Sequence, residues 1–244
     1  MRLIRVHVEA ALAAGARVEL QGAAAEHVTR VLRLGAGDPV TLFNGDGIDY
    51  PSRINVLRKG AVEVAVLGTA AARAESPLAL TLVQGIARSE RMDLVVQKAT
   101  ELGVAAIVPV VTARSVVRLD AETRAKKLAH WRGIVIAACE QCGRNRVPEI
   151  LAPVPLAHWL AQPATAGAAR WLLSPRGAEP LSTIGAPGAQ LELLVGPEGG
   201  LTEAEETLAV QAGYRAVLLG PRVLRTETAA PALLAALQAL WGDF

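Results

Sequence analysis

The sequence predicts an α/β protein with a parallel sheet, preceded by a smaller β domain. From residue 77 onward, short apolar runs alternate with helical patterns, which is typical of strands that pair in parallel. Two of these runs, Leu191–Val195 and Ala216–Leu219, end directly in a Gly-Pro pair. Residues 1–70 instead contain short strand patterns separated by turn residues, with one helical segment among them.

The strands of residues 1–70 are predicted from alternating apolar residues and from the turns between them. They cover Leu3–Val8, Val40–Phe43, Tyr50–Leu57 and Val62–Val66. Asn44–Gly47 has the sequence of a hairpin turn, and one helix is expected over about residues 24–32. Strands at this spacing with a single helix favour a small β-barrel.

Residues 71–76 lack a strand pattern and lead into Pro77, so we predict a linker there and a second domain over residues 77–244. This domain begins with a β-α-β pattern, which indicates a parallel sheet. Its first elements are expected at Leu78–Ile86, from Ser89 (as the cap) to Gly103, and at Val104–Val110. Later elements are a polar loop over Thr112–Arg118, helices over Ala121–Cys142 and Leu156–Leu160, and a strand over Trp171–Leu173.

The helix between the two Gly-Pro strands has clear boundary signals. Thr202 and Glu205 fit a capping box at its start, and Gly213 fits its C-terminal stop. The last helix is expected to run to Leu240. The order is therefore strand, loop, helix, strand, loop and final helix.

Three loops rich in glycine and proline are expected at the carboxyl ends of parallel strands, where α/β proteins bind ligands. They are Leu173–Gly177, Gly196–Leu201 and Leu218–Thr228. Glycine permits close backbone approach and proline stiffens the loop, so amides and carbonyls face the ligand. None of the loops matches a phosphate-binding or dinucleotide motif. We expect a ligand held by shape and backbone hydrogen bonds, the alternative being ordinary tight turns.

Composition restricts the class of protein. The 244 residues are 52% hydrophobic and 20% charged, which allows a sizeable core, and no apolar run is long enough for a membrane span. The first residues lack a signal-peptide pattern, which predicts a cytosolic protein. Since the net charge is only +2, nucleic-acid binding would need local basic patches. Cys139 and Cys142 lack further zinc ligands and end a helix, so we expect buried structural cysteines and no metal site.

Three motifs resemble the RsmE family: Leu194–Leu201, Leu219–Ala229 and Ala138–Pro148. Members of that family are 16S ribosomal RNA (uracil-N3)-methyltransferases of the SPOUT superfamily, and the similarity covers nearly the whole chain. The resemblance implies a trefoil-knotted parallel-sheet methyltransferase domain behind a small PUA-like β-barrel that binds RNA. It also implies S-adenosylmethionine as cofactor, the small ribosomal subunit as partner, a homodimer and a cytoplasmic location.

The resemblance further implies the residues of the cofactor site. These are Leu173, Ser174, Pro175, Val195, Gly196, Pro197, Glu198, Gly199, Gly200, Leu218, Leu219, Gly220, Arg222, Val223, Leu224, Thr226 and Thr228. Family members often carry histidine where Ser174 stands, so the resemblance implies backbone contacts at this position and leaves the role of the side chain open.

Methylation at N3 of uracil requires loss of a proton, which spreads negative charge onto O2 and O4. Arg225 is our best candidate to stabilise that charge, and the alternative is a structural ion pair with Glu227 or a neighbouring carboxylate. Further catalytic candidates are Thr226, Glu227 and Glu198, although Glu198 would equally serve to accept loop amides. The expected RNA-binding residues are Arg5, Arg30, Arg33, Arg144, Arg146 and Arg176.

Other functions stay open as alternatives. One is a different SPOUT methyltransferase, acting on transfer RNA or on a ribose 2′-hydroxyl. Another is a non-catalytic RNA-binding assembly factor, against which the intact glycine loops argue. A nucleotide-binding module is weaker still, because no phosphate-loop lysine is present.

Overall fold

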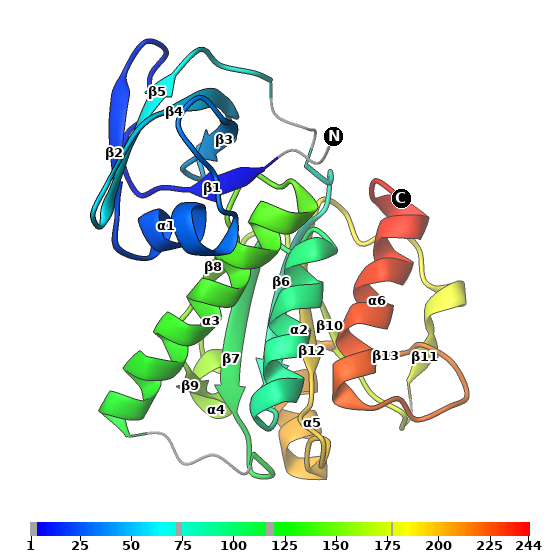
Figure 1. The fold of residues 1–244 in the computed structure, drawn as a ribbon. Coiled ribbons are helices and arrows are strands. Elements are labelled where there is room, and N and C mark those ends of the chain that lie inside the picture. The colour runs from blue at the N-terminus through cyan, green and yellow to red at the C-terminus, as the bar shows by residue number, and fades with distance from the viewer. Residues whose placement is uncertain (1–3, 72–74, 116–119, 177) are drawn as a thin grey trace. The chain divides into compact units, whose positions relative to one another are not determined.

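The computed structural model describes residues 4–71, 75–115, 120–176 and 178–244 (Figure 1). Two compact units are distinguished, residues 1–75 with Ile136–Val147, and Ser76–Val135 with Pro148–Phe244. The division at residues 70 and 77 stays a prediction, and residues 72–74 of the predicted linker lie outside the described residues. Within the described ranges, no helix is both long and apolar enough to cross a membrane.

A curled five-stranded sheet forms the first unit, with a small apolar core (Figure 1). Its strands are β1 (Arg5–His7), β2 (Arg17–Gln21), β3 (Pro39–Phe43), β4 (Tyr50–Arg58) and β5 (Ala61–Val66), in the order β1-β3-β4-β5-β2. Among the described strands of this sheet, β1 and β3 pair in parallel and the other pairs are antiparallel. Alternate residues of β2 and β5 are buried, as the two-residue period of a strand requires. The predicted small β domain is confirmed, whereas β2 was not predicted.

The helical segment of this unit is less regular than predicted. It consists of α1 (Gly22–Glu26) and the π-helix η1 (His27–Val31), so it begins earlier than expected and widens in its second half. The amide of Leu32 accordingly donates to the carbonyl of His27, five residues back, at 2.9 Å. Arg33 follows with a φ of 54°, a conformation that residues other than glycine rarely adopt.

The end of helix α3 (Ala121–Cys142) also belongs to the first unit. Burial raises the pKa of the Cys139 thiol to about 12, so this side chain stays a neutral, inert thiol. Cys142 is only partly buried and is also a free thiol. The expectation of a buried structural cysteine therefore fits Cys139 better than Cys142.

The second unit contains a parallel sheet, which confirms the predicted α/β class. Its strands are β6 (Ala79–Gly85), β7 (Ala106–Val111), β8 (Glu149–Ile150), β9 (Val154–Pro155), β10 (Ala169–Leu173), β11 (Glu179–Pro180), β12 (Gln190–Val195) and β13 (Arg215–Leu218). They follow the order β11-β13-β10-β12-β6-β7-β8, with β9 also beside β7, and every pairing is parallel. The knot stays a prediction.

The remaining helices of this unit are α2 (Ser89–Glu101), α4 (Leu156–Leu160), η2 (Leu181–Thr183), α5 (Glu203–Gln211) and α6 (Thr226–Trp241). The capping box of Thr202 and Glu205 at the start of α5 is confirmed, and Gly213 follows its end with a φ of 90°. The cap predicted for α2 was wrong, because Arg88 occupies that position and makes no side-chain capping bond. Helices α2 and α6 pack against each other, as Figure 1 shows.

The strand order explains how distant segments meet. Strand β10 lies between β13 and β12, and β12 lies next to β6. Because all these strands are parallel, the loops that follow β10, β12 and β13 leave the same edge of the sheet. The three predicted ligand loops are therefore neighbours in space.

Candidate functional site

A cavity of about 270 Å³ opens among the loops after β10, β12 and β13 and the first turn of α6. The predicted cofactor residues that line it are Leu173, Ser174, Pro175, Val195, Gly196, Pro197, Glu198, Gly199, Gly200, Leu218, Leu219, Gly220, Arg222, Val223, Leu224 and Thr226. Thr228, also predicted, is exposed in the first turn of α6 and is not among the lining residues. Gly177 of the first loop lies outside the described residues.

Two lining residues, Arg114 and Glu206, were missed by the sequence reasoning. Leu201 and Ala229 also line the cavity; each ends one of the motifs named above but was not among the predicted cofactor residues. Arg114 comes from the loop after β7, which contains neither glycine nor proline up to this point. That loop nevertheless leaves the same edge of the parallel sheet as the other three. Arg114 could therefore have been found from the rule that ligands bind at the carboxyl ends of parallel strands. Arg176, predicted to bind RNA, also lines the cavity.

The loop after β12 requires glycine where backbone segments come close. A Cβ atom on Gly85, at the end of β6, would lie 2.6 Å from the nitrogen of Pro197. A Cβ atom on Gly196 would lie 3.1 Å from the amide nitrogen of Leu201. Gly200 has a φ of 69°, which favours glycine. The loop thus folds tightly on itself and against β6, and backbone atoms line this part of the cavity.

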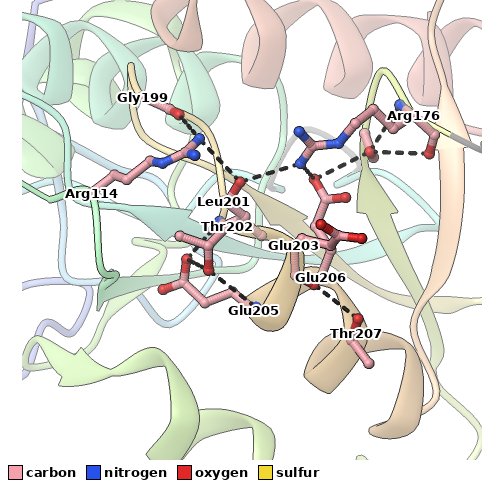
Figure 2. Close-up of polar contacts among 10 residues, drawn as sticks. Arg114, Arg176, Gly199, Leu201, Thr202, Glu203, Glu205, Glu206 and Thr207 are labelled. Carbon is pink, nitrogen blue, oxygen red and sulfur yellow. Dashed lines mark hydrogen bonds and ion pairs between the residues drawn. The ribbon is translucent and has the colours of Figure 1, made fainter.

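Two arginines converge on the carbonyl of Leu201 (Figure 2). Arg114 Nη1 donates to the Gly199 carbonyl at 2.7 Å and to the Leu201 carbonyl at 3.4 Å. Arg176 Nη2 donates to the Leu201 carbonyl at 3.4 Å. Since Figure 2 shows the two side chains approaching from opposite sides, they hold the end of the loop between them.

Arg176 is anchored a second time through helix α5. Its Nη2 lies 2.8 Å from Glu206 Oε1, and the Ser174 hydroxyl donates to the same oxygen at 3.3 Å. Ser174 Oγ also accepts the amide of Arg176 at 3.1 Å. Buried Ser174 therefore closes its own turn and links the loop after β10 to α5, a side-chain role that the sequence left open.

Glu198 is held by the start of helix α2. The amide of Arg88 donates to its Oε1 at 2.9 Å, and Arg91 Nη1 lies 3.3 Å away. Burial raises the pKa of Glu198, but the hydrogen bonds from the Arg88 and Glu198 amides and the neighbouring Arg91 outweigh it and lower the pKa below its usual value. Glu198 is thus a stable anion that positions its loop, which favours the structural interpretation over general-base catalysis.

Comparison with known proteins places the chain in a family. Residues 74–238 match the RNA methyltransferase domain, and residues 20–67 match the RNA methyltransferase PUA domain. Ribosomal RNA small subunit methyltransferase E of Bacillus subtilis is 33% identical over 86% of this chain and 85% of the relative. The chain belongs to the RsmE family. The corresponding enzyme of Mycobacterium tuberculosis is 34% identical over 93% and 87% of the two chains.

Solved structures of related proteins agree with the RsmE assignment. A methyltransferase of Legionella pneumophila, in complex with bound S-adenosylmethionine, superposes with a TM-score of 0.96 and 39% identity over 100% of both chains. Ribosomal RNA small subunit methyltransferase E of Neisseria gonorrhoeae, bound to S-adenosylmethionine, superposes with a TM-score of 0.92 and 42% identity over 100% of both chains.

The catalytic candidates taken from the RsmE resemblance differ in their surroundings. Thr226 is buried, lines the cavity and donates its hydroxyl to the Gly196 carbonyl at 2.8 Å. Glu227 lies 3.6 Å from Arg91 Nε, so the alternative ion pair between Glu227 and Arg225 is wrong. Arg225 is exposed at the cap of α6, and among the described residues it has no ion pair. Neither Arg225 nor Glu227 lines the cavity.

The arginines predicted to bind RNA in this RsmE chain fall into two groups. Arg5 is buried, with Nη1 2.6 Å from Asp49 Oδ2, and Arg144 Nη2 lies 2.6 Å from Glu75 Oε2. The structure does not support a phosphate contact by Arg5, because its guanidinium is enclosed and already paired. Arg30, Arg33, Arg146 and Arg176 are exposed. Among the described residues of this RsmE member, no cluster of side chains is arranged to hold a metal ion.

Proposed function

We propose that the protein methylates N3 of a uridine in the 16S ribosomal RNA of the small subunit, with S-adenosylmethionine as methyl donor. The observation that carries this proposal is the cavity itself, in which three stiff loops from adjacent parallel strands meet. The named relatives are small-subunit ribosomal RNA methyltransferases, and two similar proteins have been solved with S-adenosylmethionine bound.

The residues of the cavity suit this cofactor. The close approaches at Gly85 and Gly196 leave backbone groups to hydrogen-bond a flat base, while leucine and valine side chains supply apolar contact. The cavity lacks a phosphate-binding loop, and the cofactor has no phosphate. When bound, S-adenosylmethionine supplies an electrophilic methyl group on a sulfonium.

Arg225 is our candidate for stabilising the uracil anion. Its guanidinium is exposed and unpaired among the described residues, and it directly precedes the cavity residue Thr226. A charge-assisted hydrogen bond to a uracil oxygen would favour loss of the N3 proton to solvent. Glu198 is less suited to accept that proton, because its pKa is lowered and its carboxylate is engaged by Arg88 and Arg91.

RNA binding is proposed for arginines of each unit. In the first unit these are Arg30, Arg33 and Arg146, and at the cavity they are Arg114, Arg176 and Arg222. Phosphate contacts of this kind position the RNA without reading its sequence. We also propose a homodimer formed through the second unit, because exposed apolar side chains such as Val223 and Leu240 would be covered there.

Nucleoside mass spectrometry tests the proposal. Purified protein is incubated with labelled S-adenosylmethionine and small subunits from a strain that lacks the gene, and nucleosides of the 16S RNA are analysed. We expect label in 3-methyluridine. Label in a ribose-methylated nucleoside, or label only when transfer RNA is supplied, would overturn the assigned reaction.

A further inference from the structure

A buried glutamine outside the cavity lining joins two segments of the site. Gln84, at the end of β6, is fully buried. Its Nε2 donates to the carbonyl of the next residue, Gly85, at 2.9 Å and to Thr226 Oγ1 at 3.1 Å. It also lies 3.4 Å from the Gly196 carbonyl, to which Thr226 donates in turn. One amide group thus connects the loop after β12 with the first turn of α6.

The sheet register places Gln84 there. In the pairing of β6 with β12, Gln84 is opposite Val195, the residue that precedes Gly196. The next residue, Gly85, lets Pro197 approach so closely that a Cβ atom would lie 2.6 Å from the proline ring. Strand β6 therefore supports the loop both by contact and by hydrogen bonding.

Stability alone does not account for this glutamine. Its Oε1 is buried without a hydrogen-bond partner among the described residues, which is an unfavourable state for a carbonyl. Gln238, on the distal half of α6, is equally buried, but its Nε2 donates to Leu102 and its Oε1 accepts from Ser76. An apolar side chain at position 84 would remove the unpaired oxygen, but it would also remove the donor that contacts Thr226 and Gly196.

A second bridge joins the same two segments. Arg91, in the first turn of α2, lies 3.3 Å from Glu198 of the loop and 3.6 Å from Glu227 of α6. The bridge by Gln84 is buried, whereas that by Arg91 is near the surface. Gln84 lies near the end of β6 and Arg91 in the first turn of α2, so the segment from Gln84 to Arg91 connects α6 with the loop at two points.

We infer that Gln84 is a positioning residue of the methyltransferase site, which aligns Thr226 and the start of α6 with the loop from Gly196 to Leu201. This inference rests on the proposed function. Gln84 acts through Thr226 and Gly196, and it sets the distance between the cavity and Arg225, the residue before Thr226.

The test compares Gln84→Met with Gln238→Met. Methionine has nearly the length and volume of glutamine but cannot donate a hydrogen bond. Gln238→Met removes a buried amide from the distal half of α6, away from the Thr226 end that lines the cavity. Each protein is assayed for thermal stability, for S-adenosylmethionine affinity by calorimetry, and for single-turnover rate at saturating cofactor.

For Gln84→Met alone we expect about three- to tenfold weaker cofactor binding, the range of one or two lost hydrogen bonds, and a slower single turnover. Unchanged affinity and rate in Gln84→Met would overturn the inference.

A double-mutant cycle with Thr226→Val shows whether Gln84 acts through the threonine hydroxyl. If it does, Gln84→Met adds little to the loss of affinity caused by Thr226→Val. If the losses of cofactor affinity in the two single variants add fully in the double variant, Gln84 does not act through the Thr226 hydroxyl. In a Thr226→Ser background, which keeps the hydroxyl, Gln84→Met should still weaken cofactor binding. Failure of the unaltered protein to bind S-adenosylmethionine would instead contradict the proposed function, so the two failures are distinguishable.

Discussion

The side chain of Arg114 contacts the backbone of Gly199 in two ways, by a hydrogen bond and by close packing. Arg114 Nη1 donates to the Gly199 carbonyl at 2.7 Å, and a Cβ atom on Gly199 would lie 3.1 Å from Cβ and 3.2 Å from Cδ of Arg114. The space beside Gly199 is therefore occupied by the stem of an arginine. Glycine at this position serves the packing of Arg114 against the loop.

Gly199→Val is expected to weaken cofactor binding because the branched side chain displaces Arg114 and the end of its loop. Overpacking of this kind costs about 1–3 kcal/mol, which corresponds to roughly a fivefold to 150-fold loss of affinity. Calorimetry with S-adenosylmethionine measures the loss. Gly185→Ala is the control, since a Cβ atom there has no neighbour within 4 Å among the described residues. Native affinity in Gly199→Val would contradict the expected displacement.

Arg114→Gln should weaken RNA binding and reduce its salt dependence. If Arg114 contacts one phosphate, the slope of log affinity against log salt falls by about 1. Binding of small-subunit RNA is measured between low and physiological salt. The matched control is Lys126→Gln, because Lys126 is an exposed cation on α3 paired with Glu122 and does not line the cavity. An unchanged slope in Arg114→Gln would remove Arg114 from the RNA contacts.

Arg225→Ala should lower the single-turnover rate by about 10²–10³-fold, the loss typical of one oxyanion-stabilising donor. Since Arg225 has no ion pair among the described residues, cofactor affinity and melting temperature should change little. Arg225→Lys should restore only part of the rate, because an ammonium lacks the planar fork of donors. Normal single-turnover chemistry in the alanine variant would exclude a catalytic role.

Glu198→Gln should make stability less dependent on pH in the acidic range. The folded-state pKa of Glu198 is lowered, so its stabilising contribution is present above the unfolded pKa and is lost as pH falls through the folded value. At neutral pH we expect the variant to be less stable by about 1 kcal/mol, which is below the roughly 1.5–3 kcal/mol of a hydrogen bond to a charged group because Glu198 is partly exposed to solvent. Denaturant titrations at neutral and acidic pH should show this difference shrinking toward acid. A constant difference would show that the charge is not responsible.

Gly133→Ala should stabilise the protein. Gly133 is exposed within helix α3, and a Cβ atom there would meet no other atom within 4 Å among the described residues. Alanine in a helix interior is favoured over glycine by about 0.5–1 kcal/mol. Thermal unfolding should show a higher midpoint, with unchanged cofactor affinity. A lower midpoint would mean that α3 needs glycine at this turn for another reason.

Sequence reasoning succeeded where local chemistry determines the result. The bounds of α3 and α4 and the capping box of α5 were predicted correctly, because caps and apolar periodicity act within a few residues. The π-helical turn before Leu32 was not predicted, since its apolar residues fit an ordinary helix equally well. Strand β2 was missed because it is short and only two of its residues, Val18 and Leu20, are apolar.

At the candidate site, the cavity loops could be predicted from the sequence, but the residues outside the loops that hold them in place could not. The glycine and proline motifs identified most of the cavity lining. Arg114, Gln84 and Arg91 belong to a loop, a strand and a helix elsewhere in the chain, and only the three-dimensional pairing brings them to the cavity loops. Arg5 is an error of the other kind, a residue that was wrongly included. Its charge predicted phosphate binding, but its side chain is enclosed beside Asp49.

The bridge through Gln84 also bears on synthesis of the chain. Gln84 and Thr226 are separated by 142 residues, and Gln84 and Gly196 by 112. On a translating ribosome, β6 therefore emerges long before the segments it will hold, at about 5–20 residues per second. A nascent chain that ends before α6 has its first β-α-β unit but only part of the cavity lining. Cofactor binding is thus one of the last properties that the growing polypeptide acquires.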